Sequence, residues 1–233
     1  MTAPSIAVLI LFCLVALFHL ITCFGTTPSN STNTLSNYAD LSKPLLMPLL
    51  GLVAVMILIP AKATTTAWLI SFALLFGMVG DCFLLNAKDS KRFIAGTIAF
   101  FTGHVFYLFL FAPAILRLPV WSWIIAGLAA GGITFYSWKS SGGKKNLTGF
   151  VVIMYSLMLC VMAFSGIAGT VSHYTSGSLF VLLGAILFMI SDSILSATLF
   201  TKDFYPSRFI IMATYIIAEI CLVTGAVAPA VRY

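Results

Sequence analysis

The sequence predicts an all-α integral membrane protein, a bundle of about eight transmembrane helices. Of its 233 residues, 61% are hydrophobic and only 8% are charged, and the mean hydropathy is +1.11, which no soluble globular domain matches. Several apolar segments reach the ~20 residues that a membrane-spanning helix needs. They are continuously apolar, whereas the strands of a membrane β-barrel alternate. The expected helices cover residues 5–24, 44–60, 64–86, 93–113, 119–138, 147–169, 177–200 and 207–228.

The first segment is expected to be a retained helix and not a signal peptide. No Lys or Arg precedes Lys43, so the basic region of a signal peptide is missing, and the apolar run is too long for one. The polar residues 25–42 predict a flexible loop within a single domain that covers residues 1–233. Asn30 and Asn146 begin glycosylation sequons, but both fall on the expected cytoplasmic face, so we expect neither to be used.

The net charge of +6 indicates membrane topology and not nucleic-acid binding. The positive-inside rule places the more basic face in the cytoplasm and both termini on the opposite side, in a bacterial inner membrane or a eukaryotic endomembrane. Nine of the 12 basic residues lie after the first, third, fifth and seventh segments: Lys43, Lys88, Lys91, Arg92, Lys139, Lys144, Lys145, Lys202 and Arg208. The other face carries Lys62, Arg117 and Arg232.

Two acidic motifs interrupt the apolar segments at matching places. Gly80-Asp81 lies near the end of the third segment, and Ser191-Asp192 lies near the end of the seventh. At ~1.5 Å per residue, both carboxylates are roughly 8–12 Å from the basic face, and they can meet if the two helices are neighbours. An ionisable group at membrane depth is costly, so each aspartate is a candidate for a functional site. A structural role between helices is the alternative.

Further polar residues accompany these motifs at helical spacing. His104 and Glu219 lie nearer the bilayer centre in the fourth and eighth segments. Residues three or four positions apart share a helix face, so we expect one polar cavity, although an ordinary interhelical hydrogen bond remains open for each. The residues that share these faces or adjoin the motifs are Tyr107, Ser191, Ser196 and Tyr215.

The two halves of the chain show a weak internal similarity. Arg-Phe-Ile follows both acidic motifs, at residues 92–94 and 208–210, and His104 and Glu219 come at corresponding places further on. The eight segments could therefore form two parallel four-helix repeats, and repeats of this kind often build a site at their interface. Gly127 and Gly131 form a GxxxG motif, which predicts a close helix contact.

Five motifs, in order and spacing, resemble the YhhN-type lysoplasmalogenase family across residues ~40–225. They are KPLLMPLL at Lys43–Leu50, GDCFLL at Gly80–Leu85, FTGHVFYL at Phe101–Leu108, SDSILS at Ser191–Ser196 and TYIIAE at Thr214–Glu219. The resemblance implies an eight-helix hydrolase that cleaves the vinyl ether bond of lysoplasmalogens. The products would be a fatty aldehyde and glycerophosphoethanolamine or glycerophosphocholine. By motif, the family's two catalytic aspartates fall on Asp81 and Asp192, whereas the family often has Gln or Glu at Glu219.

The chemistry that this resemblance implies suits two carboxylates. A vinyl ether is hydrolysed by protonation of its β-carbon, which gives an oxocarbenium ion that water traps. Desolvation and mutual repulsion can keep one acid protonated while the other stays ionised, as in glycoside hydrolysis. We favour Asp81 as the acid because its flanks are apolar, and Asp192 as the anion because serines adjoin it. The basic residues that could hold the phosphate of a lysophospholipid are Lys43, Lys91, Arg92, Lys202 and Arg208.

No cofactor or metal is expected. The five cysteines lie within apolar segments without a CxxC motif, and no His, Cys and carboxylate spacing typical of zinc is present. An ion-coupled secondary transporter is the main alternative, although both aspartates near one face argue against it. A receptor-like scaffold and a ceramidase-type metallohydrolase are further alternatives; the second would need more histidines than the three scattered here. The sequence implies membrane lipids as partners and sets no oligomeric state.

Overall fold

A computed structural model describes residues 2–24, 34–143 and 145–230. Within these residues are eight α-helices, each long and apolar enough to cross a membrane, which confirms the predicted all-α fold class of a multi-pass membrane protein. A short 3-10 helix, Ala112–Arg117, follows the fourth. The α-helices are α1 Ala3–Cys23, α2 Thr34–Leu58, α3 Thr64–Leu84, α4 Ser90–Phe111, α5 Val120–Ser140, α6 Leu147–Val171, α7 Ser178–Phe200 and α8 Ser207–Val227.

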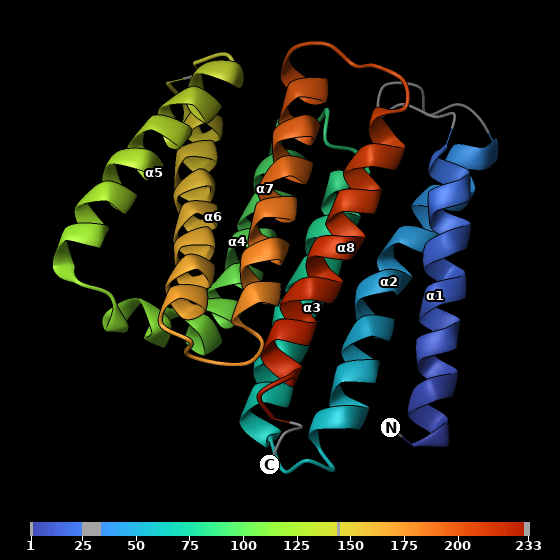
Figure 1. The fold of residues 1–233 in the computed structure, drawn as a ribbon. Coiled ribbons are helices and arrows are strands. Elements are labelled where there is room, and N and C mark those ends of the chain that lie inside the picture. The colour runs from blue at the N-terminus through green and yellow to red at the C-terminus, as the bar shows by residue number, and fades with distance from the viewer. Residues whose placement is uncertain (1, 25–33, 144, 231–233) are drawn as a thin grey trace.

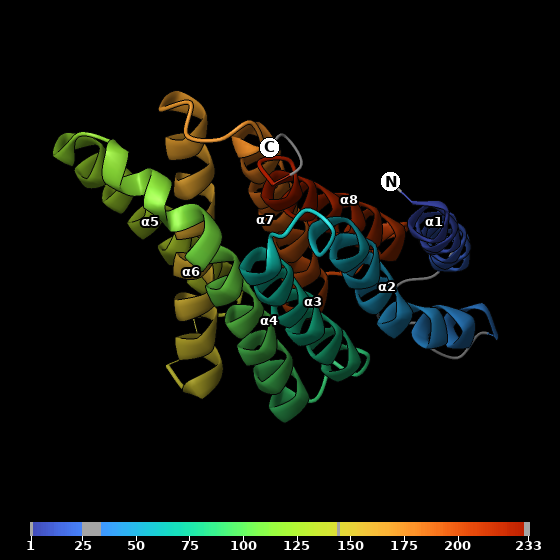
Figure 2. The same ribbon diagram turned by 90° about the horizontal axis from the view of Figure 1, so that it is seen from below.

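Seven of the helices form a closed ring. In the order α1, α2, α3, α4, α6, α7 and α8, each contacts the next, and α8 returns to α1. Seen along the helices, α2, α3 and α4 form one row that faces α1, α8 and α7 (Figure 2). α5 lies outside the ring beside α6 and leans away from it (Figure 1). The core is therefore the interior of the ring.

Successive helices run in opposite directions, so charged loops gather at one end. The connections α3–α4, α5–α6 and α7–α8 lie at the same end of the bundle, which we call the basic end, while α1 begins and α8 ends at the other (Figure 1). Among the residues used to predict topology, Lys144 and Arg232 lie outside the described chain. Which end faces the cytoplasm stays a prediction.

The structure corrects the expected loop at residues 25–42. Residues 25–33, including the sequon at Asn30, lie outside the described chain, but residues 34–42 form the first turns of α2. This polar stretch is helical because neighbouring helices satisfy its side chains. The Ser42 hydroxyl bonds to His19 Nδ1 at 2.8 Å, and Arg208 forms an ion pair with Asp40. As a result Lys43 lies inside a helix and not in a loop.

Close contact between α3 and α4 fixes the depth of the first acidic motif. A Cβ built on Gly80 would lie 2.6 Å from the ring of Phe100, so only glycine allows this approach. In contrast, a Cβ on Gly127 or Gly131 in α5 would meet nothing within 4 Å. The helix contact expected from the GxxxG motif is therefore wrong for the described chain, and α5 packs loosely along this face.

Candidate active site

Asp81 is fully enclosed near the basic end of α3. Its side chain is contacted from two other helices. Lys43 Nζ from α2 lies 3.1 Å from Oδ1, and the Tyr215 hydroxyl from α8 donates to Oδ2 at 3.0 Å. The residue is only 1% exposed. Lys43, which was expected to contact the substrate, thus has its ammonium in an ion pair with this carboxylate.

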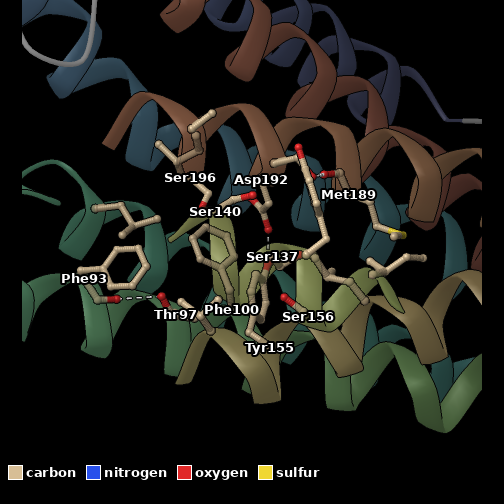
Figure 3. A pocket seen from close by; sticks show the side chains of 18 residues that line it. Phe93, Thr97, Phe100, Ser137, Ser140, Tyr155, Ser156, Met189, Asp192 and Ser196 are labelled. Carbon is tan, nitrogen blue, oxygen red and sulfur yellow. Dashed lines mark hydrogen bonds between the residues drawn. The ribbon is translucent and has the colours of Figure 1, made fainter. Parts of the chain in front are cut away.

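Asp192 on α7 faces a cavity. The Tyr155 hydroxyl from α6 donates to its Oδ2 at 2.5 Å, and both side chains line a cavity of about 200 Å³ between α4, α5, α6 and α7 (Figure 3). Tyr155 was missed at the sequence level because nothing along α6 points to a carboxylate on another helix. Asp192 is therefore the aspartate that a molecule in this cavity would touch.

The serines around Asp192 have other hydrogen-bond partners. Ser191 donates to the carbonyl of Ile211 on α8 at 2.9 Å, and Ser193 donates to a carbonyl of its own helix. Ser196 lines the cavity and bonds to Ser141 Oγ at 3.2 Å. The expectation that these hydroxyls stabilise the anion of Asp192 therefore has no support in the geometry. Ser191 joins α7 to α8 instead.

Glu219 adds a third carboxylate to the same region. It is 3% exposed on α8 and accepts a hydrogen bond from the Tyr107 hydroxyl of α4 at 2.8 Å. A Cβ on Gly77 of α3 would lie 3.6 Å from the Tyr215 hydroxyl and 3.9 Å from Glu219 Oε1. Among the described residues, Asp81, Asp192 and Glu219 form one ion pair between them, that of Asp81 with Lys43.

His104 is buried with one nitrogen unpaired. Its Nδ1 bonds to the carbonyl of Phe100 at 2.8 Å, while its Nε2 has no hydrogen-bond partner among the described residues. The ring centroid lies 5.9 Å from that of Tyr155 and 6.4 Å from that of Tyr107. His104 is thus placed between the tyrosines that hold Asp192 and Glu219. Buried polar atoms of native proteins are nearly always paired, so this nitrogen calls for a functional or solvent partner.

Three aromatic rings connect the two aspartates. Phe100, Phe188 and Tyr215 meet edge to face, with centroid distances of 5.5 to 6.1 Å. Tyr215 bonds to Asp81, and Phe100 lines the cavity of Asp192. These rings give the two carboxylates an apolar neighbour, and charges interact more strongly in a medium of low dielectric constant.

A second, smaller pocket opens at the basic end. It measures about 110 Å³ and is lined by Lys43, Asp40, Arg208 and Lys88 among others. Leu84 and Leu195 line both this basic pocket and the cavity of Asp192, so the two spaces adjoin. Arg92, also expected to bind substrate, is exposed at the start of α4 and lines neither space.

The expected site residues therefore fall into three groups. Asp192 and Ser196 line the cavity, and Lys43 and Arg208 line the basic pocket. Most of the other expected residues are buried in the helix bundle and line neither space; we call them the buried network. That network contains Asp81, His104, Tyr107, Ser191, Tyr215 and Glu219. Within the described chain, no three His, Cys, Asp or Glu side chains are grouped as metal ligands would be.

Comparison with known proteins identifies similar sequences. The model of the YhhN family matches residues 38–226. Lysoplasmalogenase TMEM86B of Mus musculus is 28% identical over 168 residues, which cover 71% of this chain and 66% of the relative. Lysoplasmalogenase TMEM86A of Homo sapiens is 31% identical over 171 residues, 71% of this chain and 68% of the relative. The chain spans about two thirds of the length of these curated relatives. No solved structure matches it.

Proposed function

The chain belongs to the YhhN family, and we propose that it is a membrane-embedded hydrolase that cleaves the vinyl ether bond of lysoplasmalogens. The products are a fatty aldehyde and glycerophosphoethanolamine or glycerophosphocholine. Support comes from curated relatives that are named lysoplasmalogenases. The observation that carries the proposal is the pair of unlike aspartates, of which one is in an ion pair and the other faces a cavity.

Charge balance distinguishes the roles of the two aspartates. Lys43 compensates one negative charge, and it lies on Asp81 at 3.1 Å. The charge of Asp192 would have no such partner, and burying an uncompensated carboxylate at membrane depth costs free energy. This favours Asp192 as the neutral acid. Tyr155 occupies only its Oδ2, so Oδ1 can carry the proton toward the cavity. This assignment reverses the one that the flanking residues favoured.

The proposed reaction uses Asp192 twice. Its carboxyl proton is transferred to the β-carbon of the vinyl ether, which leaves an oxocarbenium ion and a carboxylate. The carboxylate then accepts a proton from water as the water oxygen bonds to the cationic carbon, which gives a hemiacetal. The hemiacetal breaks to an aldehyde and the glycerol hydroxyl, with the proton passing from one oxygen to the other. The ionised Asp81 stabilises the cation, as a second carboxylate does in glycoside hydrolysis.

The adjoining basic pocket suits the phosphate of the substrate. Lys43 and Arg208 line it, and cationic side chains bind phosphate through charge-assisted hydrogen bonds. A lysolipid places its glycerol-linked bond just below its headgroup. With the phosphate in the basic pocket, that bond falls toward the cavity where Asp192 lies. The lysophospholipid would come from the surrounding membrane lipids.

Aldehyde release from a defined 1-alkenyl lysophosphoethanolamine tests the proposal. Purified protein in detergent should release aldehyde at the same rate with and without a chelator. Asp192→Asn should lower kcat by about 10²–10⁴-fold, the usual contribution of a general acid, without lowering the thermal stability, because the amide oxygen still accepts from Tyr155. Asp89→Asn, at the exposed start of α4, is the matched control and should keep its activity.

One outcome would overturn the proposed activity, and another would overturn the role of Asp192. If well-folded protein releases no aldehyde, the lysoplasmalogenase activity is wrong, and transport of ions or lipids becomes the next activity to assay. If Asp192→Asn turns over at the wild-type rate, the activity stands, but Asp192 is not its acid.

A further inference from the structure

A long apolar groove lies between α5 and the ring of helices. It measures about 560 Å³ and runs along α5 and α6. α5 buries only one residue, Thr134, and its lower half stands well away from α6 (Figure 1). Side chains that line the groove include Trp121, Ile125, Ala126, Ala129, Phe164 and Ile167.

The groove is continuous with the cavity of Asp192. Ile133 of α5 and Met189 of α7 line both spaces. On α5, residues that line only the cavity follow Ile133 toward the basic end, for example Ser137 and Ser140, whereas the other α5 residues of the groove precede it. The basic pocket, the cavity and the groove therefore follow one another from the basic end toward the opposite end of the bundle.

We propose that this groove holds the hydrocarbon chain of the lysolipid while its vinyl ether bond lies at Asp192. This inference rests on the proposed function and adds a chain-binding site and a route of entry. From Ile133 to Trp121, the groove spans twelve positions of α5, which is roughly 18 Å along the helix. One leaflet of the hydrocarbon core is about 15 Å thick, so a single chain of leaflet length fits the groove.

The order of polar and apolar surfaces matches one lysolipid. Cations line the first space, the carboxylate with its tyrosine lies in the second, and nearly all-apolar side chains line the third. A lysolipid presents phosphate, ether and chain in the same order. α5 separates the groove from the surrounding lipid and packs loosely, burying only Thr134. The substrate can therefore enter laterally from its leaflet without leaving the membrane.

The groove acts by orientation and not by affinity. Bilayer hydrocarbon is as apolar as the groove, so a chain that moves between them gains little hydrophobic free energy. Holding the chain in one direction places the ether bond against Asp192, and such positioning contributes to the rate. An obstruction in the groove should therefore act only on chains long enough to meet it.

Two tryptophan variants test this dependence on chain length. Ala126 lines the groove seven residues from Ile133, roughly 10 Å farther from Asp192. Ala126→Trp should lower kcat/KM for a leaflet-length chain by about tenfold, the usual cost of overfilling a packed space. It should leave a chain too short to reach that position unaffected. Leu128→Trp, at an exposed residue of the same helix that does not line the groove, should change neither value.

A cross-linking experiment tests the groove without hydrolysis. The probe is an ester-linked lysophosphatidylcholine with a diazirine near its chain end, read out by peptide mass spectrometry. Labelling should concentrate on residues 118–133 and 160–171 and should fall several-fold in Ala126→Trp. α1, whose outer face is also exposed, is the internal reference for random contact with detergent-borne lipid.

The outcomes separate this inference from the proposed function. Equal labelling of α1 and α5, or an equal loss of kcat/KM for short and long chains in Ala126→Trp, would overturn the chain-binding role of the groove. Aldehyde release by the wild type would still support the activity. Labelling confined to the groove in a protein that releases no aldehyde would overturn the activity and keep the groove as a lysolipid site.

Discussion

The ion pair between Lys43 and Asp81 makes a quantitative prediction. At a separation of 3.1 Å and an effective dielectric constant of ~20, two unit charges attract by about 5 kcal/mol. Removing one partner of such a pair costs ~3–5 kcal/mol because the other charge remains buried and unpaired. Lys43→Met leaves a carboxylate whose side chain is 2% exposed, so we expect this variant to suffer the full loss.

The reverse substitution should cost less. Asp81→Asn leaves a lysine whose side chain is 14% exposed, and its ammonium can extend toward the basic end, as long cationic side chains do. We expect a loss of about 1–2 kcal/mol for this variant. The double variant Lys43→Met/Asp81→Asn removes both charges and should be more stable than Lys43→Met alone. The coupling energy between the two sites should then be at least ~2 kcal/mol.

Thermal unfolding in detergent measures the stability of the wild type, the two single variants and the double variant, which together form a double-mutant cycle. For a chain of this size, 1 kcal/mol corresponds to a shift in Tm of about 2–4 °C, so Lys43→Met should lower Tm by roughly 10 °C and the double variant should recover most of that. Aldehyde release should be lost in all three variants, because the ionised Asp81 is absent or unpaired in each. If the two single losses add in the double variant, the pair does not act as a unit and the assigned roles of the two aspartates lose their basis.

Four further substitutions test the surroundings of the site. Gly80→Ala should cost ~1–3 kcal/mol by overpacking, whereas Gly127→Ala should raise stability by ~0.5–1 kcal/mol; equal Tm shifts would contradict the close approach of α3 and α4. His104→Leu removes an unpaired buried nitrogen, so stability should stay within ~1 kcal/mol of wild type while kcat/KM falls; an unchanged rate would show that the nitrogen takes no part in substrate binding or in the reaction. Tyr155→Phe should lower kcat/KM by roughly tenfold through the lost hydrogen bond to Asp192, as measured by steady-state aldehyde release.

The helices could be predicted because the bilayer imposes a simple pattern. Every backbone group must be satisfied within the hydrocarbon, so a long apolar run forms a helix, and the expected segments coincide closely with α3 and α5 to α8. The rule failed at residues 34–42, whose small polar residues and following prolines are typical of a loop. Their partners are His19 on α1 and Arg208 on α8, which are distant in the sequence and carry no local signal.

The acids of the site could be predicted, and their partners could be predicted only in part. Asp81, Asp192 and Glu219 stand out because carboxylates are rare in apolar segments. Tyr107 and Tyr215 could be predicted because each shares a helix face with His104 or Glu219, and they donate to Glu219 and Asp81. Tyr155 could not, because tyrosines are common near membrane interfaces and α6 carries no acid that would mark its bond to Asp192. The prediction that the flanking serines stabilise the anion of Asp192 has no support in the structure for a related reason. A hydroxyl next to an acid along a helix points to another face and bonds to a backbone carbonyl, as Ser191 does.

The partners of the aspartates also give the proposed repeat a chemical meaning. If α3 corresponds to α7, the helices before them, α2 and α6, correspond as well. Each of these preceding helices contributes one side chain to the acid that follows: Lys43 to Asp81 and Tyr155 to Asp192. Lysine carries a charge and tyrosine does not, so on the proposed assignment the first half compensates its carboxylate as an anion and the second half leaves its carboxylate without a compensating cation. A single difference between two similar halves would thus supply the acid and the anion that the hydrolysis of a vinyl ether requires.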